Sequence, residues 1–213
     1  KPFGLDAHFI GHPEAFGDFL SAKPSDETIK EPRTKFNKII LLPGSRRSEI
    51  SLILPEMLAA TAIIKRHDPN VNFVLPAVPH LLPLIQSLVA GSGVTILDQP
   101  DDLIPALQTS DAMIATSGTI TLQAALCGTV GVTCYRTGAF SGFIGRRLVD
   151  LDKVILPNAI LGRPLYPFYF QEAATGKTLA AATLDCFYDT NAKSRARHAA
   201  VEIKSLLTGG AQS

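Results

Sequence analysis

Short apolar segments alternate with helix-period segments from residue 38 onward, and this alternation is the feature that most constrains the fold. Candidate strands, each rich in Val or Ile and bounded by Gly, Pro or Asp, lie at 38–42, 72–77, 94–97, 112–115 and 130–135. Candidate helices lie at 48–67, 80–90, 103–109, 119–127 and 140–149. Buried parallel strands connected by helices have this pattern. The chain is therefore predicted to be α/β, with a Rossmann-like parallel sheet and helices on both faces.

The segments on either side of this alternation have a different character. Residues 1–37 are rich in Pro, Lys and Asp and are predicted to be a lead-in or interdomain linker. A possible final strand precedes residue 156, and two extra C-terminal helices are expected at 178–189 and 192–207. The predicted organisation is a linker at 1–37, a Rossmann-like domain at 38–175, and C-terminal helices with a tail at 176–213.

Composition excludes several classes of function. A net charge of +1 argues against a general nucleic-acid surface, so no nucleic-acid partner is expected. The three cysteines have no C-x-x-C spacing and the five histidines have no ligand spacing, so we expect neither a disulfide framework nor a metal site. This cysteine usage favours a reducing cytoplasm. No apolar run approaches the roughly 18 residues that span a bilayer.

The first predicted strand runs into a Gly44-Ser45-Arg46 turn that opens a helix. Amide groups in the first turn of a helix lack partners within the helix and lie at its positive end, which suits a bound anion. Arg46 adds a fork of donors, and Glu49 is spaced to hold that guanidinium on the helix surface. Alone, the turn is weak evidence, because Pro-Gly and Ser also occur at strand-to-helix connections that bind nothing.

A second turn, Ser117-Gly118-Thr119, repeats this logic after the strand at 112–115. Gly118 allows a ligand to approach the backbone closely, and Gln123 lies one helical turn beyond Thr119 on the same face. The alternative is a capped helix without a ligand. In an open parallel sheet, ligands bind beyond the carboxyl ends of the strands, so two such turns favour a nucleoside diphosphate.

Two further segments carry polar groups with two possible roles each. Asn158 and Arg163 follow the possible final strand, and Asn158 either contacts a ligand or caps a turn. The segment 140–149 combines Phe140 and Phe143 with the pair Arg146 and Arg147. This combination suits an anionic membrane surface or acyl chains, and it also fits a core-packed helix whose arginines reach water.

Taken together, these motifs resemble the lipid-A-disaccharide synthase family. The resemblance rests on Leu-Leu-Pro-Gly-Ser-Arg-x-x-Glu-Ile at 41–50, Ser-Gly-Thr-x-Thr-Leu at 117–122, Tyr-Arg at 135–136, Leu-Pro-Asn-x-x-x-Gly-Arg at 156–163, and Gln171. Gly-His-Pro at 11–13 is similar to that family's interdomain connection. The similarity covers nearly the whole chain but only the carboxyl-terminal half of the enzyme.

The resemblance implies one half of a GT-B glycosyltransferase that binds the UDP part of a sugar donor. The family transfers 2,3-diacylglucosamine from UDP to 2,3-diacylglucosamine 1-phosphate, with inversion, in lipid A biosynthesis. No cofactor is implied, and the general base is expected on the missing N-terminal half, so the fragment alone is expected to be inactive. The implied location is cytoplasmic, peripheral to the inner membrane of a Gram-negative bacterium. The implied donor-binding residues are Gly44, Ser45, Arg46, Ser117, Gly118, Thr119, Gln123, Asn158 and Arg163.

The chain departs from the family pattern at two positions. Gln123 stands where the family usually has a Glu suited to ribose hydroxyls, and Phe168 stands where it usually has another Glu. Gln can still bind ribose, but its neutral hydrogen bonds are weaker than charged ones. Two alternatives therefore stay open: another GT-B enzyme that uses a UDP-sugar, and a non-catalytic nucleotide-binding module.

Overall fold

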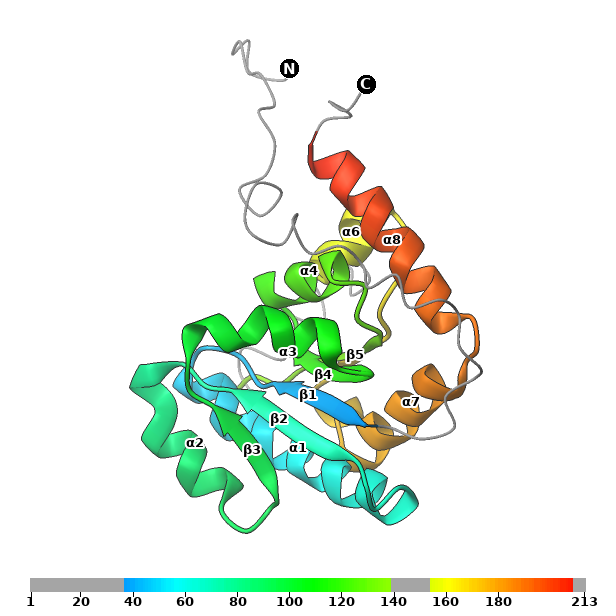
Figure 1. The fold of residues 1–213 in the computed structure, drawn as a ribbon. Coiled ribbons are helices and arrows are strands. Elements are labelled where there is room, and N and C mark those ends of the chain that lie inside the picture. Colours follow the sequence, from blue (N-terminus) through cyan, green and yellow to red (C-terminus); the bar gives the residue numbers. More distant parts are fainter. Residues whose placement is uncertain (1–36, 139–153, 209–213) are drawn as a thin grey trace.

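The computed structural model describes residues 37–138 and 154–208 and contains one six-stranded parallel sheet between two layers of helices (Figure 1). The strands are β1 Lys38–Leu42, β2 Asn72–Pro76, β3 Val94–Leu97, β4 Ala112–Thr116, β5 Gly131–Tyr135 and β6 Phe168–Phe170. The α-helices are α1 Arg47–His67, α2 Leu82–Val89, α3 Leu103–Thr109, α4 Thr119–Leu126, α6 Leu156–Leu161, α7 Gly176–Tyr188 and α8 Ala192–Leu207. Short 3₁₀ turns are η3 Pro79–Leu81, η4 Pro100–Asp102 and η6 Gln171–Ala173.

The strand order in space is β3-β2-β1-β4-β5-β6. From β1 the chain adds β2 and β3 on one side of the sheet. It then returns to the centre, where β4 pairs with β1, and adds β5 and β6 on the other side. Strands β1 and β4 pair in parallel, with Ile39 opposite Ala112 and Leu42 opposite Ala115. The direction of building reverses between these two strands, and this reversal opens a crevice at their carboxyl ends in sheets of this kind.

Alternate residues along the buried strands supply two separate cores, one on each face of the sheet. Ile39 and Leu41 pack with α1, α2 and α7, whereas Ile40 and Leu42 pack with α3, α4, α6 and α8. All four side chains are at most 5% exposed, and burying each one contributes roughly 1.5–3 kcal/mol. Helices α7 and α8 belong to these layers, because both contribute buried side chains to the cores that contain the strands.

The fold class is confirmed, and β1, β3, α3 and α8 have the predicted bounds. Of the possible strand before residue 156, only residues 154 and 155 are described, and they form a bend that leads into α6. The sixth strand is Phe168–Phe170. Pro157 lies in the first turn of α6, where its fixed φ suits a helix. The expected helix at 140–149, the linker and the tail after residue 208 lie outside the described residues.

A buried tyrosine anchors the connection between α6 and β6. Tyr166 is 2% exposed, and its hydroxyl donates to the carbonyl of Thr129 across 2.8 Å. Burial raises the pKa of this phenol well above its usual value. Its backbone N–H donates to Asn158 Oδ1, so a helix side chain and a core hydroxyl together position β6.

Tyr166→Phe is expected to lower the free energy of unfolding by about 1 kcal/mol, because the Thr129 carbonyl loses its buried donor. Tyr166→Ala should cost ~3–5 kcal/mol through the cavity it leaves. Tyr169→Phe is the matched control, because Tyr169 is only half-buried on β6, and it should change stability by less than about 0.5 kcal/mol. Urea unfolding measures all three, and equal losses for the two Phe variants would contradict the anchoring role.

Candidate functional site

The first turn at the carboxyl edge of the sheet requires glycine. Gly44 follows β1 with φ of +101°, which L-residues rarely adopt. A Cβ there would lie 2.5 Å from Glu49 Oε2 and 3.2 Å from Thr116 Oγ1. The positive φ therefore disfavours larger residues, and the short distance to Thr116 places the turn directly against the end of β4.

Arg46 and Glu49 form the ion pair that the sequence predicted. Arg46 Nη1 donates to Glu49 Oε1 across 2.7 Å, and the backbone N–H of Arg46 donates to Glu49 Oε2 across 3.3 Å. The Arg46 side chain is 75% exposed and that of Glu49 is 10% exposed. The hydrogen bond that Arg46 donates to Glu49 raises the pKa of Arg46, so this guanidinium stays charged. Most of its donors remain directed away from Glu49, because only Nη1 contacts that carboxylate.

Tyr135 joins the end of β5 to this ion pair. Its hydroxyl donates to Glu49 Oε1 across 3.5 Å, and its pKa is raised by burial first and by the Glu49 charge second. The sequence indicated Tyr135 only as part of the family resemblance and not as a partner of Glu49. Glu49 therefore contacts both the turn that follows β1 and the end of β5.

The second turn lies at the end of β4 and begins α4. Gly118 has φ of +154°, and no side chain caps the helix that starts after it. The N–H of Ser117 donates to the carbonyl of Cys134 across 3.1 Å, which ties the turn to β5. Thr119 is exposed at the start of α4, and Gln123 is half-buried one turn further along the helix.

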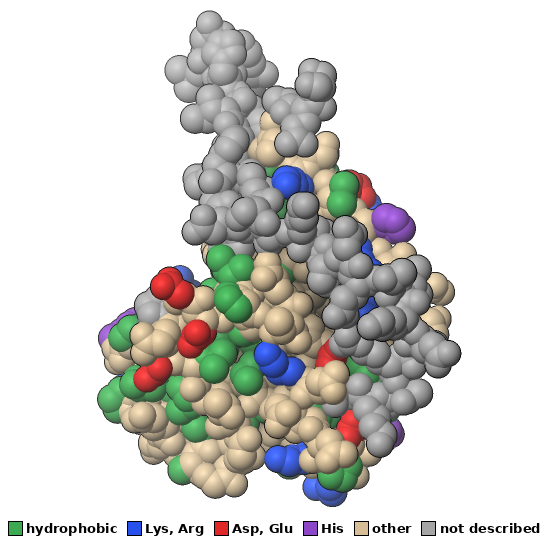
Figure 2. Space-filling view, viewed as in Figure 1, with side chains coloured by type: hydrophobic (Ala, Val, Ile, Leu, Met, Phe, Trp, Pro, Cys, Tyr) green, Lys and Arg blue, Asp and Glu red, His purple; other side chains and the backbone are tan. Residues whose placement is uncertain are grey.

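The two turns lie side by side at the reversal point of the sheet. Thr116 Oγ1 donates to the carbonyl of Leu42 across 3.2 Å, which joins the ends of β4 and β1 directly. Amide groups at the starts of α1 and α4 and the guanidinium of Arg46 therefore gather at one edge. On the face seen in Figure 2, basic and acidic side chains of the described residues are interspersed. Directional donors at the starts of α1 and α4 would recognise an anion at this edge of the sheet.

Asn158 and Arg163 are not brought to these turns by any contact of the described residues. Asn158 is 4% exposed, its Nδ2 donates to the Tyr166 carbonyl, and its Oδ1 accepts from the N–H groups of Leu165 and Tyr166. This is the turn-capping alternative that the sequence left open. Its role in donor binding stays a prediction.

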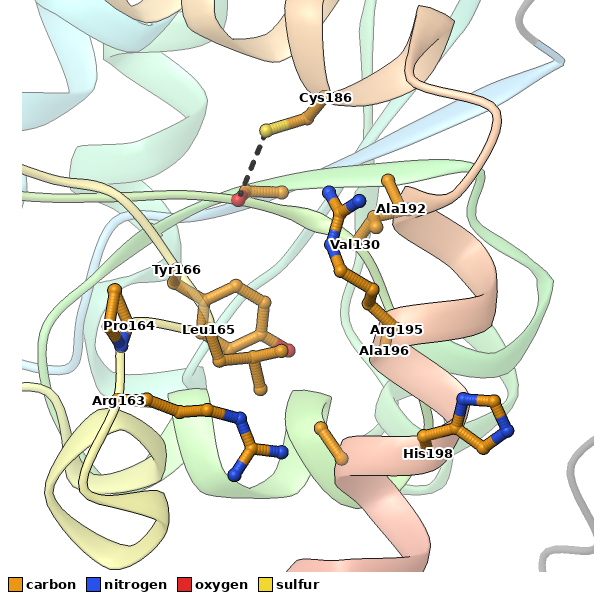
Figure 3. Close-up of a pocket in the computed structure, with 12 residues that line it drawn as sticks. Val130, Arg163, Pro164, Leu165, Tyr166, Cys186, Ala192, Arg195, Ala196 and His198 are labelled. Atoms are coloured by element: carbon orange, nitrogen blue, oxygen red, sulfur yellow. Dashed lines mark hydrogen bonds between the residues drawn. The ribbon is translucent and has the colours of Figure 1, made fainter.

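Arg163 lies on a pocket at the other edge of the sheet. Its Nη1 donates to Glu202 Oε1 across 2.8 Å. The pocket also includes Val130 and Gly131 at the amino end of β5, and Figure 3 shows Arg163 across from residues of α8. The turns lie at the carboxyl ends of the strands, so the length of the strands separates Arg163 from them. Its role as a donor ligand also stays a prediction.

The sequence analysis did not identify the contacts that Glu49 and Glu56 of α1 make with residues at the end of β5. Glu49 contacts Tyr135, and Glu56 forms a 2.7 Å ion pair with Arg136. Part of the signal was available, because Glu49 and Glu56 are seven residues apart on a helix and therefore share one face.

Among residues 37–138 and 154–208, no group of three or more His, Cys, Asp or Glu side chains is arranged to hold a metal ion. No helix in the same ranges is long and apolar enough to cross a bilayer. The proposed membrane-contact residues Phe140, Phe143, Arg146 and Arg147 lie outside the described ranges.

The strand order and the paired turns define the class: this is a Rossmann-like domain of the kind that forms half of a GT-B glycosyltransferase. Solved structures with the same fold include the kitacinnamycin glycotransferase, with a TM-score of 0.56, 14% identity, and coverage of 88% of this chain and 44% of that one. The spinosyn rhamnosyltransferase complexed with thymidine diphosphate has a TM-score of 0.52, 18% identity, and coverage of 81% of this chain and 43% of that one.

Comparison of sequences specifies the family. The family model for lipid-A-disaccharide synthetase matches residues 1–211. The lipid-A-disaccharide synthase of Burkholderia vietnamiensis is 39% identical over 196 residues, covering 85% of this chain and 47% of the relative. The Bradyrhizobium diazoefficiens synthase is 31% identical over 211 residues, covering 97% and 53%. The chain belongs to the lipid-A-disaccharide synthase family and spans about half the length of these relatives.

The cysteines are expected to react slowly in the folded protein. Burial raises the pKa of Cys127 and of Cys186 to about 11, and that of Cys134 further. At pH 8 the thiolate fraction of the first two is therefore on the order of a thousandth. Iodoacetamide labelling followed by mass spectrometry should be at least ~10-fold slower in native protein than in urea. Rapid native labelling at Cys134 would contradict its burial.

Proposed function

We propose that this chain binds the nucleotide of a sugar donor in a lipid-A-disaccharide synthase. The observation that carries the proposal is the contact between the ends of β1 and β4 at the reversal point, from which the two glycine turns begin. The proposed donor-binding residues are Gly44, Ser45, Arg46, Ser117, Gly118, Thr119 and Gln123. The family suggests UDP as the nucleotide.

The chemistry of this edge suits a departing diphosphate. As a sugar leaves UDP, negative charge grows on the β-phosphate. Fixed amide groups at the starts of α1 and α4 would stabilise that charge without reorganising, and Arg46 would add a cation already oriented by Glu49. These donors would act most strongly at the transition state, where the charge is largest.

The remaining parts of the reaction are assigned by family membership. The donor would be UDP-2,3-diacylglucosamine, the acceptor 2,3-diacylglucosamine 1-phosphate, and the reaction an inverting transfer. The base that deprotonates the acceptor hydroxyl would come from the half of the relatives that this chain does not cover. Acylated substrates would bring the enzyme to the cytoplasmic surface of the inner membrane, with Phe140, Phe143, Arg146 and Arg147 as candidate contacts.

Arg46→Ala is expected to weaken UDP binding by roughly 10- to 100-fold, the loss typical of a charge-assisted hydrogen bond of ~1.5–3 kcal/mol. Isothermal titration calorimetry measures it. Arg195→Ala is the matched control, because Arg195 is an exposed arginine paired with Asp189 and lies on the pocket at the other edge. Arg163→Ala, measured alongside, tests the prediction that this residue also binds the donor. Equal affinity of wild type and Arg46→Ala, or no UDP binding by wild type, would overturn the proposed site.

Transfer is expected to require the upstream half. This chain alone should bind UDP and form no disaccharide, whereas a fusion to the N-terminal half of the B. vietnamiensis relative should transfer the acylated sugar. Chromatography of labelled products follows the reaction. Transfer of non-acylated sugar from UDP-glucosamine would favour a different GT-B acceptor, and a folded fusion that binds UDP without any transfer would favour the non-catalytic module.

A further inference from the structure

Arg136 joins three elements at the carboxyl edge of the sheet and is not among the proposed donor ligands. It directly follows β5. Its Nη1 lies 2.7 Å from Glu56 Oε1 on α1, and its Nε donates to the carbonyl of Gln171 across 3.2 Å. The side chains of Arg136 and Glu56 are 25% and 26% exposed, so both ends of the ion pair are largely shielded. A planar guanidinium presents N–H groups on separate nitrogens in a fixed geometry, whereas a lysine presents its three N–H groups on a single nitrogen.

The Gln171 side chain forms two hydrogen bonds with the backbone of Thr137, the residue that follows Arg136. Its Oε1 accepts from the N–H of Thr137 across 3.3 Å, and its Nε2 donates to the carbonyl of Thr137 across 3.2 Å. The paired ladder of β5 and β6 ends at Tyr135 opposite Phe170. Beyond the end of the ladder, the Gln171 side chain therefore satisfies the N–H and carbonyl groups of Thr137, which the backbone of a neighbouring strand would otherwise do.

The backbone of Gln171 is strained. Its φ is +52°, the only positive value at a non-glycine residue in the described ranges, and the residue is 9% exposed. A left-handed conformation costs an L-residue on the order of 1 kcal/mol and persists only where surrounding contacts enforce it. The two bonds to Thr137 and the bond from Arg136 are those contacts.

Glu56 connects this set to the following helix. Its Oε2 accepts from the N–H of Gly176 across 2.7 Å, at the start of α7. A Cβ at position 176 would lie 2.5 Å from the Cβ of Ala59, so the start of α7 approaches α1 closely. One carboxylate thus holds the end of β5 and the start of α7 in a fixed relation to α1.

This contact set lies beside the second turn of the proposed site. Strand β5 is the neighbour of β4, and the N–H of Ser117 donates to the carbonyl of Cys134, three residues before Thr137. We propose that Gln171, with Arg136 and Glu56, is a positioning residue that holds the Thr137 peptide in place beside the Ser117–Thr119 turn, so that a nucleoside diphosphate meets a preformed edge. The inference rests on the proposed function and adds residues that act without touching the ligand.

Gln171→Asn tests the inference, because Asn accepts a left-handed backbone as well as Gln does but its shorter side chain does not reach Thr137. Calorimetry should show UDP binding to the full 213-residue chain weakened by roughly three- to tenfold. Arg136→Lys should weaken it similarly, because one ammonium nitrogen would have to reach both partners that Arg136 contacts through Nη1 and Nε.

Thr175→Ala separates positioning from general loosening. Thr175 Oγ1 caps α7 by accepting from the N–H of Thr178 across 3.2 Å, four residues after Gln171, and it has no bond to Thr137 among the described contacts. This variant should lower the melting temperature by a few degrees. Its affinity for UDP should match wild type.

The outcomes are distinct. Weaker binding in Gln171→Asn and Arg136→Lys, with unchanged binding in Thr175→Ala, supports the inference. Unchanged binding in Gln171→Asn, or equal weakening in Thr175→Ala at a similar melting temperature, overturns it. Failure of the wild-type chain to bind UDP overturns the proposed function itself. A change in the affinity of the variants alone would leave the proposed function standing.

Discussion

The parallel pairing of β1 with β4 is the constraint on which the rest of the structure depends. These strands are the two central ones, their side chains fill both cores, and their register sets Leu42 opposite Ala115. A slip by one residue would exchange the side chains that face the two helix layers, so burial on both faces specifies the register. The same register places the ends of the two strands level. The proximity of the two glycine turns therefore follows from core packing and needs no stabilisation of its own.

Helix α1 supplies a second set of contacts at the same edge of the sheet. Its buried apolar face, including Ile53 and Met57, packs on the sheet, and the carboxylates of Glu49 and Glu56 lie two turns apart beside it. Glu49 contacts Arg46 and Tyr135, and Glu56 contacts Arg136 and the start of α7. The last residue of β5 and the residue that follows it are thus matched to successive carboxylates of one helix. Partly buried hydrogen bonds of this kind contribute specificity of position more than net stability.

The sequence predicted the sheet well because its strands are short, apolar and bounded by turn residues, a pattern with few alternatives. The Arg46–Glu49 pair was also predictable, since it depends only on spacing along a helix. Predictions were weaker between residues 154 and 175, where contacts between residues far apart in the sequence decide the structure. Strand β6 is three residues long and half-buried, and its place depends on Tyr166 reaching the Thr129 carbonyl. The contact of Gln171 with Thr137 joins residues 34 positions apart, which no local pattern specifies.

The charges at the carboxyl edge of the sheet indicate that an anion would be recognised there by the arrangement of hydrogen-bond donors. Glu49 is largely buried beside Arg46, so the pair has little net charge at a distance, and the field of the proposed site falls off quickly. What remains close to the surface is a set of oriented donors: unused guanidinium N–H groups and the amides that begin α1 and α4. Such donors favour an anion of the right shape at short range. They attract other anions only weakly from afar, which would suit release of the charged product that the proposed transfer forms.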